Sequence, residues 1–216
     1  TNITLNKDLT MIINSKAPKG TTILGLPFHG LEFCNVTYMC IKEPKGLLSV
    51  PANFMKVLQP VLAELFKHND FDDQYLYFSL KKGHVAPYTM QMRSGFHVDG
   101  FLSEDRNWVL SDSLPTTVAL GQFSVEPDHE VSLHEFNDQA RLKKHEKLKP
   151  HTLYELDKEC VHSTSTNLSG ETVVRTFLKV VASKEKFNGI GNAWNYKLPH
   201  IVPTAHRGST RNHTVV

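Results

Sequence analysis

The sequence has few cysteines and no long apolar run. Its 216 residues include three cysteines, at positions 34, 40 and 160, which are too few and too scattered for a disulfide framework or a zinc cluster. Thiols that stay reduced fit a reducing compartment, so we expect a cytoplasmic protein. Because no apolar run is long enough to cross a bilayer, we expect no membrane partner.

An excess of charge of one sign is also lacking. The chain has 24 Lys and Arg against 22 Asp and Glu, a formal net charge of +2, so nothing global indicates a nucleic-acid partner or an acidic membrane surface. Three catalytic signatures are absent as well: the Gly-x-Ser-x-Gly elbow, the phosphate-binding glycine loop and the Cys-x-x-Cys pair. The function must therefore be sought in other residues.

The length suits a single domain with a full core, and the hydrophobic fraction of 40% is ordinary for a globular protein. We expect one domain over residues 1–216. Within it, residues 1–84 hold N-terminal strands and a support helix, and residues 85–183 form a core that carries a charged insertion at about 127–150. Residues 184–216 form a C-terminal extension.

One helix and many short strands are predicted. Apolar residues recur at helical spacing from Phe54 to Phe66, Ser49 is a candidate N-cap, and Pro60 should kink or split the helix. Strand-like runs separated by turn signals follow at 74–80, 85–93, 107–111, 116–120, 153–156, 159–162 and 172–181. The turn at 166–171 is expected to close a hairpin between the last two. The pattern favours a mainly β fold with flanking helices, a jelly roll.

Two residues in Gly95-Phe96-His97-Val98-Asp99-Gly100-Phe101 have metal-binding chemistry. His97 and Asp99 are two apart, so on an extended strand both side chains leave the same face. A second imidazole, from His162 on another strand-like run, would complete a three-point face and leave the opposite positions open. Two His and one carboxylate arranged in this way are typical of non-haem Fe(II) oxygenases.

Arg175 lies in the middle of the apolar run 172–181. A buried guanidinium in such a strand is costly unless it meets an anion. A dicarboxylate cosubstrate would supply that anion.

Taken in order, His97-x-Asp99, His162 and Arg175 resemble the Fe(II)/2-oxoglutarate-dependent dioxygenase superfamily, over roughly residues 88–183. The resemblance implies a double-stranded β-helix, with Fe(II) bound by the three ligands and no further catalytic residue. It also implies that 2-oxoglutarate chelates the iron and meets Arg175 through its far carboxylate. With O2, such an enzyme hydroxylates a small molecule or a side chain and releases succinate and CO2.

The sequence departs from this family at one position. Many members carry a hydroxyl two residues after the Arg, where this chain has Phe177. Four residues are candidates to replace that hydroxyl: Tyr88, Thr89, Ser111 and Ser113; of these we take Tyr88 and Ser111 as cofactor-binding candidates.

A substrate pocket is expected beyond the iron. Arg93, Phe101 and Trp108 are candidates to line it, although core packing explains the two aromatic residues equally well. Two other functions also remain open. One is a cupin-like metal-dependent isomerase or binding protein, which needs no Arg anion site; the other is a structural jelly-roll protein in which the His and Asp residues are incidental.

Overall fold

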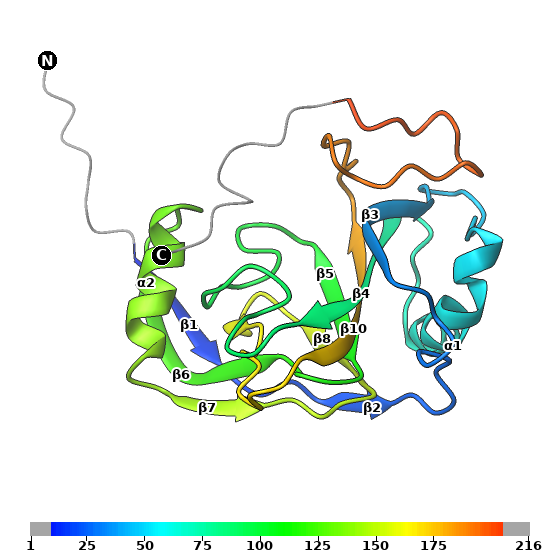
Figure 1. Ribbon diagram of the computed structural model, residues 1–216. Coiled ribbons are helices and arrows are strands. Elements are labelled where there is room, and N and C mark those ends of the chain that lie inside the picture. The colour runs from blue at the N-terminus through cyan, green and yellow to red at the C-terminus, as the bar shows by residue number, and fades with distance from the viewer. Residues whose placement is uncertain (1–9, 205–216) are drawn as a thin grey trace, which may run out of the picture.

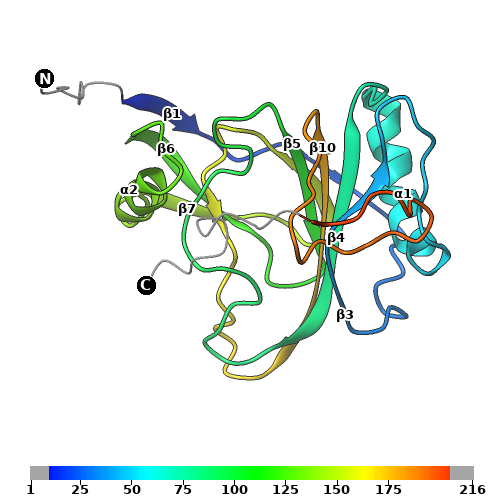
Figure 2. The same ribbon diagram turned by 90° about the horizontal axis from the view of Figure 1, so that it is seen from above.

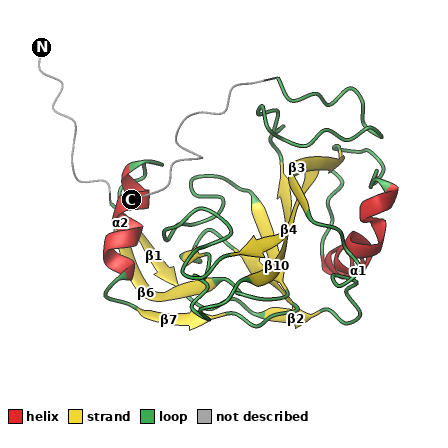
Figure 3. Cartoon of the chain, in the orientation of Figure 1, coloured by secondary structure: helices red, strands yellow, loops and turns green. Residues whose placement is uncertain are grey.

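The computed structural model describes residues 10–204; the outermost parts of the expected N- and C-terminal segments, 1–9 and 205–216, lie outside the described residues. This part of the chain is mainly β-sheet with two helices (Figure 3). No helix in it is both long and apolar enough to cross a membrane. The elements are β1 (Met11–Ser15), β2 (Gly20–Thr22), β3 (Cys34–Lys42), α1 (Ala52–His68), β4 (Tyr75–Val85), β5 (Arg106–Ser111), β6 (Thr117–Val125), α2 (Val131–Ala140), β7 (Lys144–Lys147), β8 (Thr152–Leu156), β9 (His162–Ser163) and β10 (Val173–Ser183).

The strands form a larger and a smaller sheet. The larger has the order β2-β8-β5-β10-β4-β3, and its neighbouring strands are antiparallel. In the smaller sheet β6 pairs with β1, β7 and the short β9. Figures 1 and 2 show α1 beside the larger sheet and α2 beside the smaller one, at opposite sides of the molecule.

Helix α1 covers the outer face of the larger sheet. Its predicted apolar stripe is buried from Val57 to Leu65 and packs in one cluster with residues of β4, β5 and β10. Each such side chain contributes about 1.5–3 kcal/mol when it is buried fully. The helix begins at Ala52 after Pro51, without a side-chain cap, and continues through Pro60. The predicted cap at Ser49 and a split at Pro60 are therefore wrong.

Two other predictions fail for reasons of topology. Strand β4 ends at Val85 and no strand follows at 86–93, so this stretch forms a loop between the sheets. The predicted hairpin between His162 and Arg175 does not form, because β9 pairs with β6 in the smaller sheet while β10 pairs with β4 and β5 in the larger one. The turn at 166–171 thus carries the chain from one sheet to the other.

Strand β10 presents a different set of side chains to each face of the larger sheet. Leu178, Val180 and Ala182 point to the α1 side, where they join the helix cluster. The alternate residues point between the two sheets, as the period of two in a strand requires. Arg175, Phe177 and Lys179 belong to this second set, and all three are buried.

Candidate metal centre

The two predicted histidine ligands lie directly opposite each other on neighbouring backbone segments. The His97 N–H donates to the His162 carbonyl at 2.9 Å, and the His162 N–H donates back to the His97 carbonyl at 2.9 Å. Residues paired in this way project their side chains to the same side, and the two ring centroids are 4.6 Å apart. A two-residue β-bridge thus brings together ligands that are 65 positions apart in the chain.

Backbone carbonyls orient both imidazoles. The Nδ1 atom of His97 lies 3.1 Å from the Gly95 carbonyl oxygen, and that of His162 lies 2.9 Å from the Cys160 carbonyl oxygen. Since a carbonyl oxygen only accepts, we assign the proton to Nδ1 in each ring. Nε2 is then the atom available to a metal, and its direction is fixed.

Asp99 completes the group. One of its carboxylate oxygens lies 3.9 Å from His97 Nε2, and the other lies 3.5 Å from His162 Nε2. The three ligand atoms all lie within 4.8 Å of one another. The sharp turn after Asp99 uses Gly100 at φ +70°, where a Cβ would lie 2.8 Å from the Asp105 carbonyl oxygen.

Helix α2 holds the segment that carries His97. The Asn137 Oδ1 atom accepts the Phe96 N–H at 2.8 Å, and its Nδ2 donates to the Leu133 carbonyl at 2.7 Å. Gly95, at φ +98°, lies so close that a Cβ there would be 2.9 Å from the Asn137 amide. The insertion at 127–150 therefore has a structural role, because its helix supports the loop that carries His97 and Asp99.

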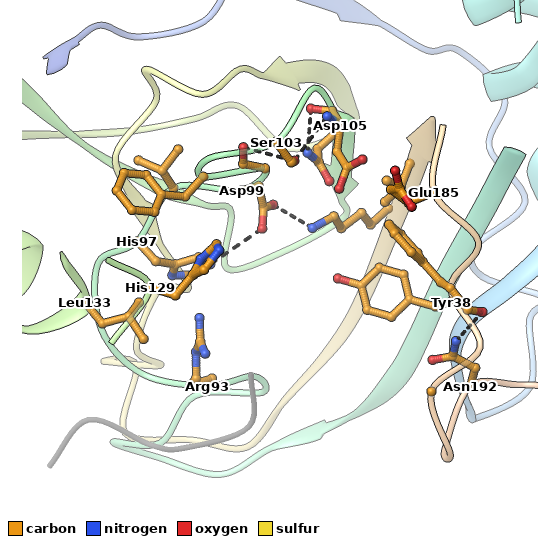
Figure 4. Close-up of a pocket in the computed structure, with 18 of the residues that line it drawn as sticks. Tyr38, Arg93, His97, Asp99, Ser103, Asp105, His129, Leu133, Glu185 and Asn192 are labelled. Atoms are coloured by element: carbon orange, nitrogen blue, oxygen red, sulfur yellow. Dashed lines mark hydrogen bonds and ion pairs between the residues drawn. The ribbon is translucent and has the colours of Figure 1, made fainter. Parts of the chain in front are cut away.

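Two of the three residues, His97 and Asp99, line a cavity of about 590 Å³ between the sheets, and His162 is buried directly behind them. Residues of 97–107, of α2 and of the segment after β10 form its walls, and Figure 4 shows His97, Asp99, Leu133 and Glu185 among them. Aromatic rings and charges both line it: Tyr38, Phe101, Phe136 and Phe187 among the former, and Arg93, Lys179, Lys186, Asp105 and Glu185 among the latter. The mixed lining suits a polar ligand with some apolar surface.

Burial and the neighbouring charges shift the pKa values of the two imidazoles in opposite directions. Burial, together with the neighbouring His162, lowers the pKa of His97 to about 3. Burial also disfavours a charged His162, but its contact with the Asp99 carboxylate outweighs this and raises its pKa to about 10. Burial alone would raise the pKa of Asp99; the ammonium of Lys179 reverses the effect and holds that pKa well below its usual range.

We expect acid to destabilise the protein through His97. Between pH 6.5 and about 3 an unfolded His97 binds a proton that the folded one does not, so the free energy of unfolding falls as the pH falls. At 1.36 kcal/mol per pKa unit the effect is at most about 5 kcal/mol. Asp99 adds to the loss at lower pH, whereas the contribution of His162 is complete below pH 6.5 and is lost only as the pH rises toward 10.

Urea unfolding at a series of pH values, with EDTA present, measures this dependence. His97→Gln should flatten the slope between pH 6.5 and 4, whereas His134→Gln, on the exposed side of α2, should keep the wild-type slope. Equal slopes in the two variants would show that His97 is not the group responsible.

The predicted pocket residues are divided between two regions. Arg93 and Phe101 line the cavity. Trp108 faces the other side of the larger sheet, where its ring packs edge-on against Phe71 with centroids 5.6 Å apart. Trp108 is therefore a core residue. Its side chain points to the same face of β5 as that of Leu110, toward α1.

The predicted cosubstrate residues do not line the cavity. Arg175 donates to the carbonyls of Ser113 (3.2 Å) and Leu114 (2.9 Å) and to the Gln91 side chain (2.7 Å). Tyr88 is 73% exposed, and Ser111 borders a separate small hollow. Of the other candidates, Thr89 donates its hydroxyl to the Ala86 carbonyl, and Ser113 donates to the Val174 carbonyl.

Phe177 lies between Arg175 and Lys179 along the inner face of β10. Its ring lies 4.8 Å from the Arg175 guanidinium carbon and belongs to the apolar cluster between the sheets. Four residues of strand rise place the Cα atoms of Arg175 and Lys179 about 13 Å apart. The structure thus brings His97, Asp99 and His162 together, whereas Arg175 lies outside the cavity.

Lys179 is the cation that the sequence analysis missed. Its Nζ atom lies 2.7 Å from Asp99 Oδ2. Burial alone would lower the pKa of this ammonium, but Asp99 and Tyr38 raise it above the usual value. The signal was available, because Lys179 interrupts the same apolar strand as Arg175 and faces the same side.

No protein-family model matches the sequence, and no curated protein is significantly similar to it. The solved structures with some similarity to this chain include the following three. The first is EvdMO1 (16% identity, TM-score 0.31, 50% of this chain and 26% of that one). The second is the non-heme monooxygenase ThoJ in a nickel complex (10%, 0.37, 76% and 69%). The third is EvdO2 from Micromonospora carbonacea var. aurantiaca, complexed with 2-oxoglutarate (14%, 0.35, 62% and 60%).

This chain thus spans about a quarter of the length of EvdMO1 and 60% of that of EvdO2. Similarities this weak establish neither the fold family nor the activity of the protein.

Proposed function

We propose that the protein is a non-haem Fe(II)- and 2-oxoglutarate-dependent dioxygenase with a double-stranded β-helix (jelly-roll) core. The observation that carries the proposal is the convergence of two imidazole nitrogens and one carboxylate within 4.8 Å, beside a cavity that His97 and Asp99 line. Two His and one carboxylate with open positions suit Fe(II).

The residues present fit such an ion. Both Nε2 atoms are directed by Nδ1 hydrogen bonds, and Asp99 supplies a carboxylate with a strongly lowered pKa. When bound, Fe(II) with 2-oxoglutarate and O2 supplies the oxidation of a C–H bond, with release of succinate and CO2. The chain's own contribution is to fix the ligands and to shield the site with the Phe101 and Phe136 rings.

The cavity also limits where acidic ligands can bind. Among the described residues that line it, the cations are Arg93, Lys179 and Lys186. We propose that a carboxylate of the cosubstrate or of a small-molecule or side-chain substrate meets a cation of this set. Arg175 is already surrounded by carbonyl and amide oxygens on the far side of Phe177.

The placement of Arg175 also favours a second candidate, a cupin-like metal-dependent isomerase or binding protein. Such a protein would use the same three ligands without 2-oxoglutarate. The third possibility, a structural jelly roll, predicts no metal binding.

Anaerobic titration of the full chain separates the three. With Fe(II) and 2-oxoglutarate, the dioxygenase is expected to show a metal-to-ligand absorption band in the visible range, absent from Asp99→Ala. Fe(II) binding without the band would contradict the dioxygenase proposal and support the second candidate. If no metal binds to the wild-type protein, the metal centre itself is refuted.

A further inference from the structure

Lys179 occupies an unusual position for a lysine. It is 8% exposed, within a strand whose residues from Arg175 to Ser183 are buried on both faces. Its ammonium contacts Asp99 Oδ2 at 2.7 Å (dashed in Figure 4), so one of the three ligands is held by an ion pair inside the cavity. Burying a charged ammonium is favourable only where interactions with its partners compensate for the lost hydration.

A distortion in β3 places an aromatic wall beside this lysine. Val36 pairs with Leu80 and Met39 with Phe78, so two residues of β3 stand opposite one residue of β4. The extra residue lets Val36 and Met39 both face α1, and it leaves Tyr38 on the cavity side. Bulges near active sites often redirect a side chain in this way.

Tyr38 is fixed in that orientation. Its φ is +44°, a region that a bulky residue rarely adopts, and its N–H donates to Ser79 Oγ at 2.9 Å. Its ring packs edge-on against Phe187, with centroids 5.6 Å apart, and lies 5.8 Å from the Lys179 ammonium. Lys179 is therefore confined between Tyr38 and Asp99.

We propose that Lys179 is a positioning residue that binds one oxygen of Asp99, so that this carboxylate offers only its other oxygen to the metal. A carboxylate can bind a metal through one oxygen or through two, and the second mode occupies one more coordination position. A charge-assisted hydrogen bond from Lys179 opposes that mode. It keeps a position open for a ligand that chelates through two atoms, such as a 2-oxo acid.

This inference rests on the proposed metal binding at the triad, and it makes an unusual prediction. Loss of a merely structural lysine would weaken metal binding and chelation together. Loss of a lysine that keeps Asp99 to one oxygen leaves the metal bound as tightly or more tightly, because Asp99 gains a second contact and a nearby positive charge disappears. Only the chelating ligand then loses affinity.

The experiment uses Lys179→Met, with Lys179→Gln as a second, shorter uncharged variant and Lys179→Arg as the conservative control. Isothermal titration with Mn(II) gives the metal affinity of each full-length protein. Titration of the Mn(II)-loaded proteins with 2-oxoglutarate, and with pyruvate, gives the affinity for two-point chelators. Pyruvate is included because it chelates in the same way but has no far carboxylate.

We expect Lys179→Met and Lys179→Gln to bind Mn(II) no more than 3-fold more weakly than the wild type, and both chelators about 10-fold more weakly. The affinities of Lys179→Arg for Mn(II), 2-oxoglutarate and pyruvate should each stay within 3-fold of the wild-type values. If only 2-oxoglutarate binding is weakened, Lys179 meets the far carboxylate and the inference is overturned. The inference is also overturned if the uncharged variants bind Mn(II) and both chelators more weakly to the same extent, or if their affinity for the chelators is unchanged. It is overturned as well if the Mn(II)-loaded wild type binds neither 2-oxoglutarate nor pyruvate. A wild type that binds no Mn(II) refutes the proposed metal centre instead.

Discussion

Replacing His162 by alanine is expected to lower the affinity of the protein for a divalent metal by at least about 100-fold, since changes even outside the coordination sphere cost 10–100-fold. His162 supplies one of three donor atoms, and its Nε2 is directed by the Cys160 carbonyl. The backbone bridge to His97 does not depend on the imidazole, so the fold should persist. Titration with Mn(II) or Co(II) measures the loss.

His129→Ala is the matched control. His129 lines the same cavity but does not belong to the group of potential ligands, so its loss should change metal affinity by less than about 3-fold. Equal effects of the two variants would mean that the cavity binds metal through some other set of residues. An unchanged affinity in His162→Ala would contradict the metal centre directly.

The grouping of His97, Asp99 and His162 could be predicted from the sequence because much of its geometry is local. His97 and Asp99 are two residues apart, one on a β-bridge and the other at the start of the turn that follows, and only the arrival of His162 requires tertiary structure. That arrival depends on the β-bridge between the two histidines, which no local pattern encodes. The prediction used the residue types and their order along the chain. The structure shows the backbone bridge that brings the two histidines together.

The elements were predictable where the pattern was periodic, and the connections between them were not. The α1 stripe and the β5 and β6 strands lie close to their predicted positions. The hairpin prediction failed because β9 has only two residues and pairs with β6. A turn signal at 166–171 shows that the chain reverses, but not which sheet it enters afterwards.

Lys179 and Tyr38 illustrate two kinds of missed residue. The argument used for Arg175, that a cation within an apolar strand needs an anionic partner, applies equally to Lys179, and Asp99 is that partner. Tyr38 is different, because its orientation depends on a bulge relative to β4. The sequence of β3 alone alternates in a way that would place Tyr38 with Val36, on the face toward the helix.

The second large effect is expected at Arg175, and it concerns stability. Arg175 is 1% exposed, and burial lowers its pKa to about 10, so it stays charged at neutral pH. Arg175→Met leaves the Gln91 side chain and the Ser113 and Leu114 carbonyls without this donor. Because hydrogen bonds to a charged group contribute about 1.5–3 kcal/mol and orphaned buried acceptors cost more, we expect a loss of about 3–5 kcal/mol in urea unfolding.

The same variant decides between two roles for this arginine. A stabilising link between β10 and the 113–114 turn predicts that Mn(II) and 2-oxoglutarate affinities of folded Arg175→Met stay within about 2-fold of the wild type, because Arg175 does not line the cavity. Val174→Met, at the neighbouring exposed position, should change neither stability nor binding appreciably. If 2-oxoglutarate affinity instead falls 10-fold or more while stability is kept, the guanidinium reaches the cosubstrate. The original expectation for Arg175 would then hold, and the apolar layer at Phe177 would have to open when the ligand binds.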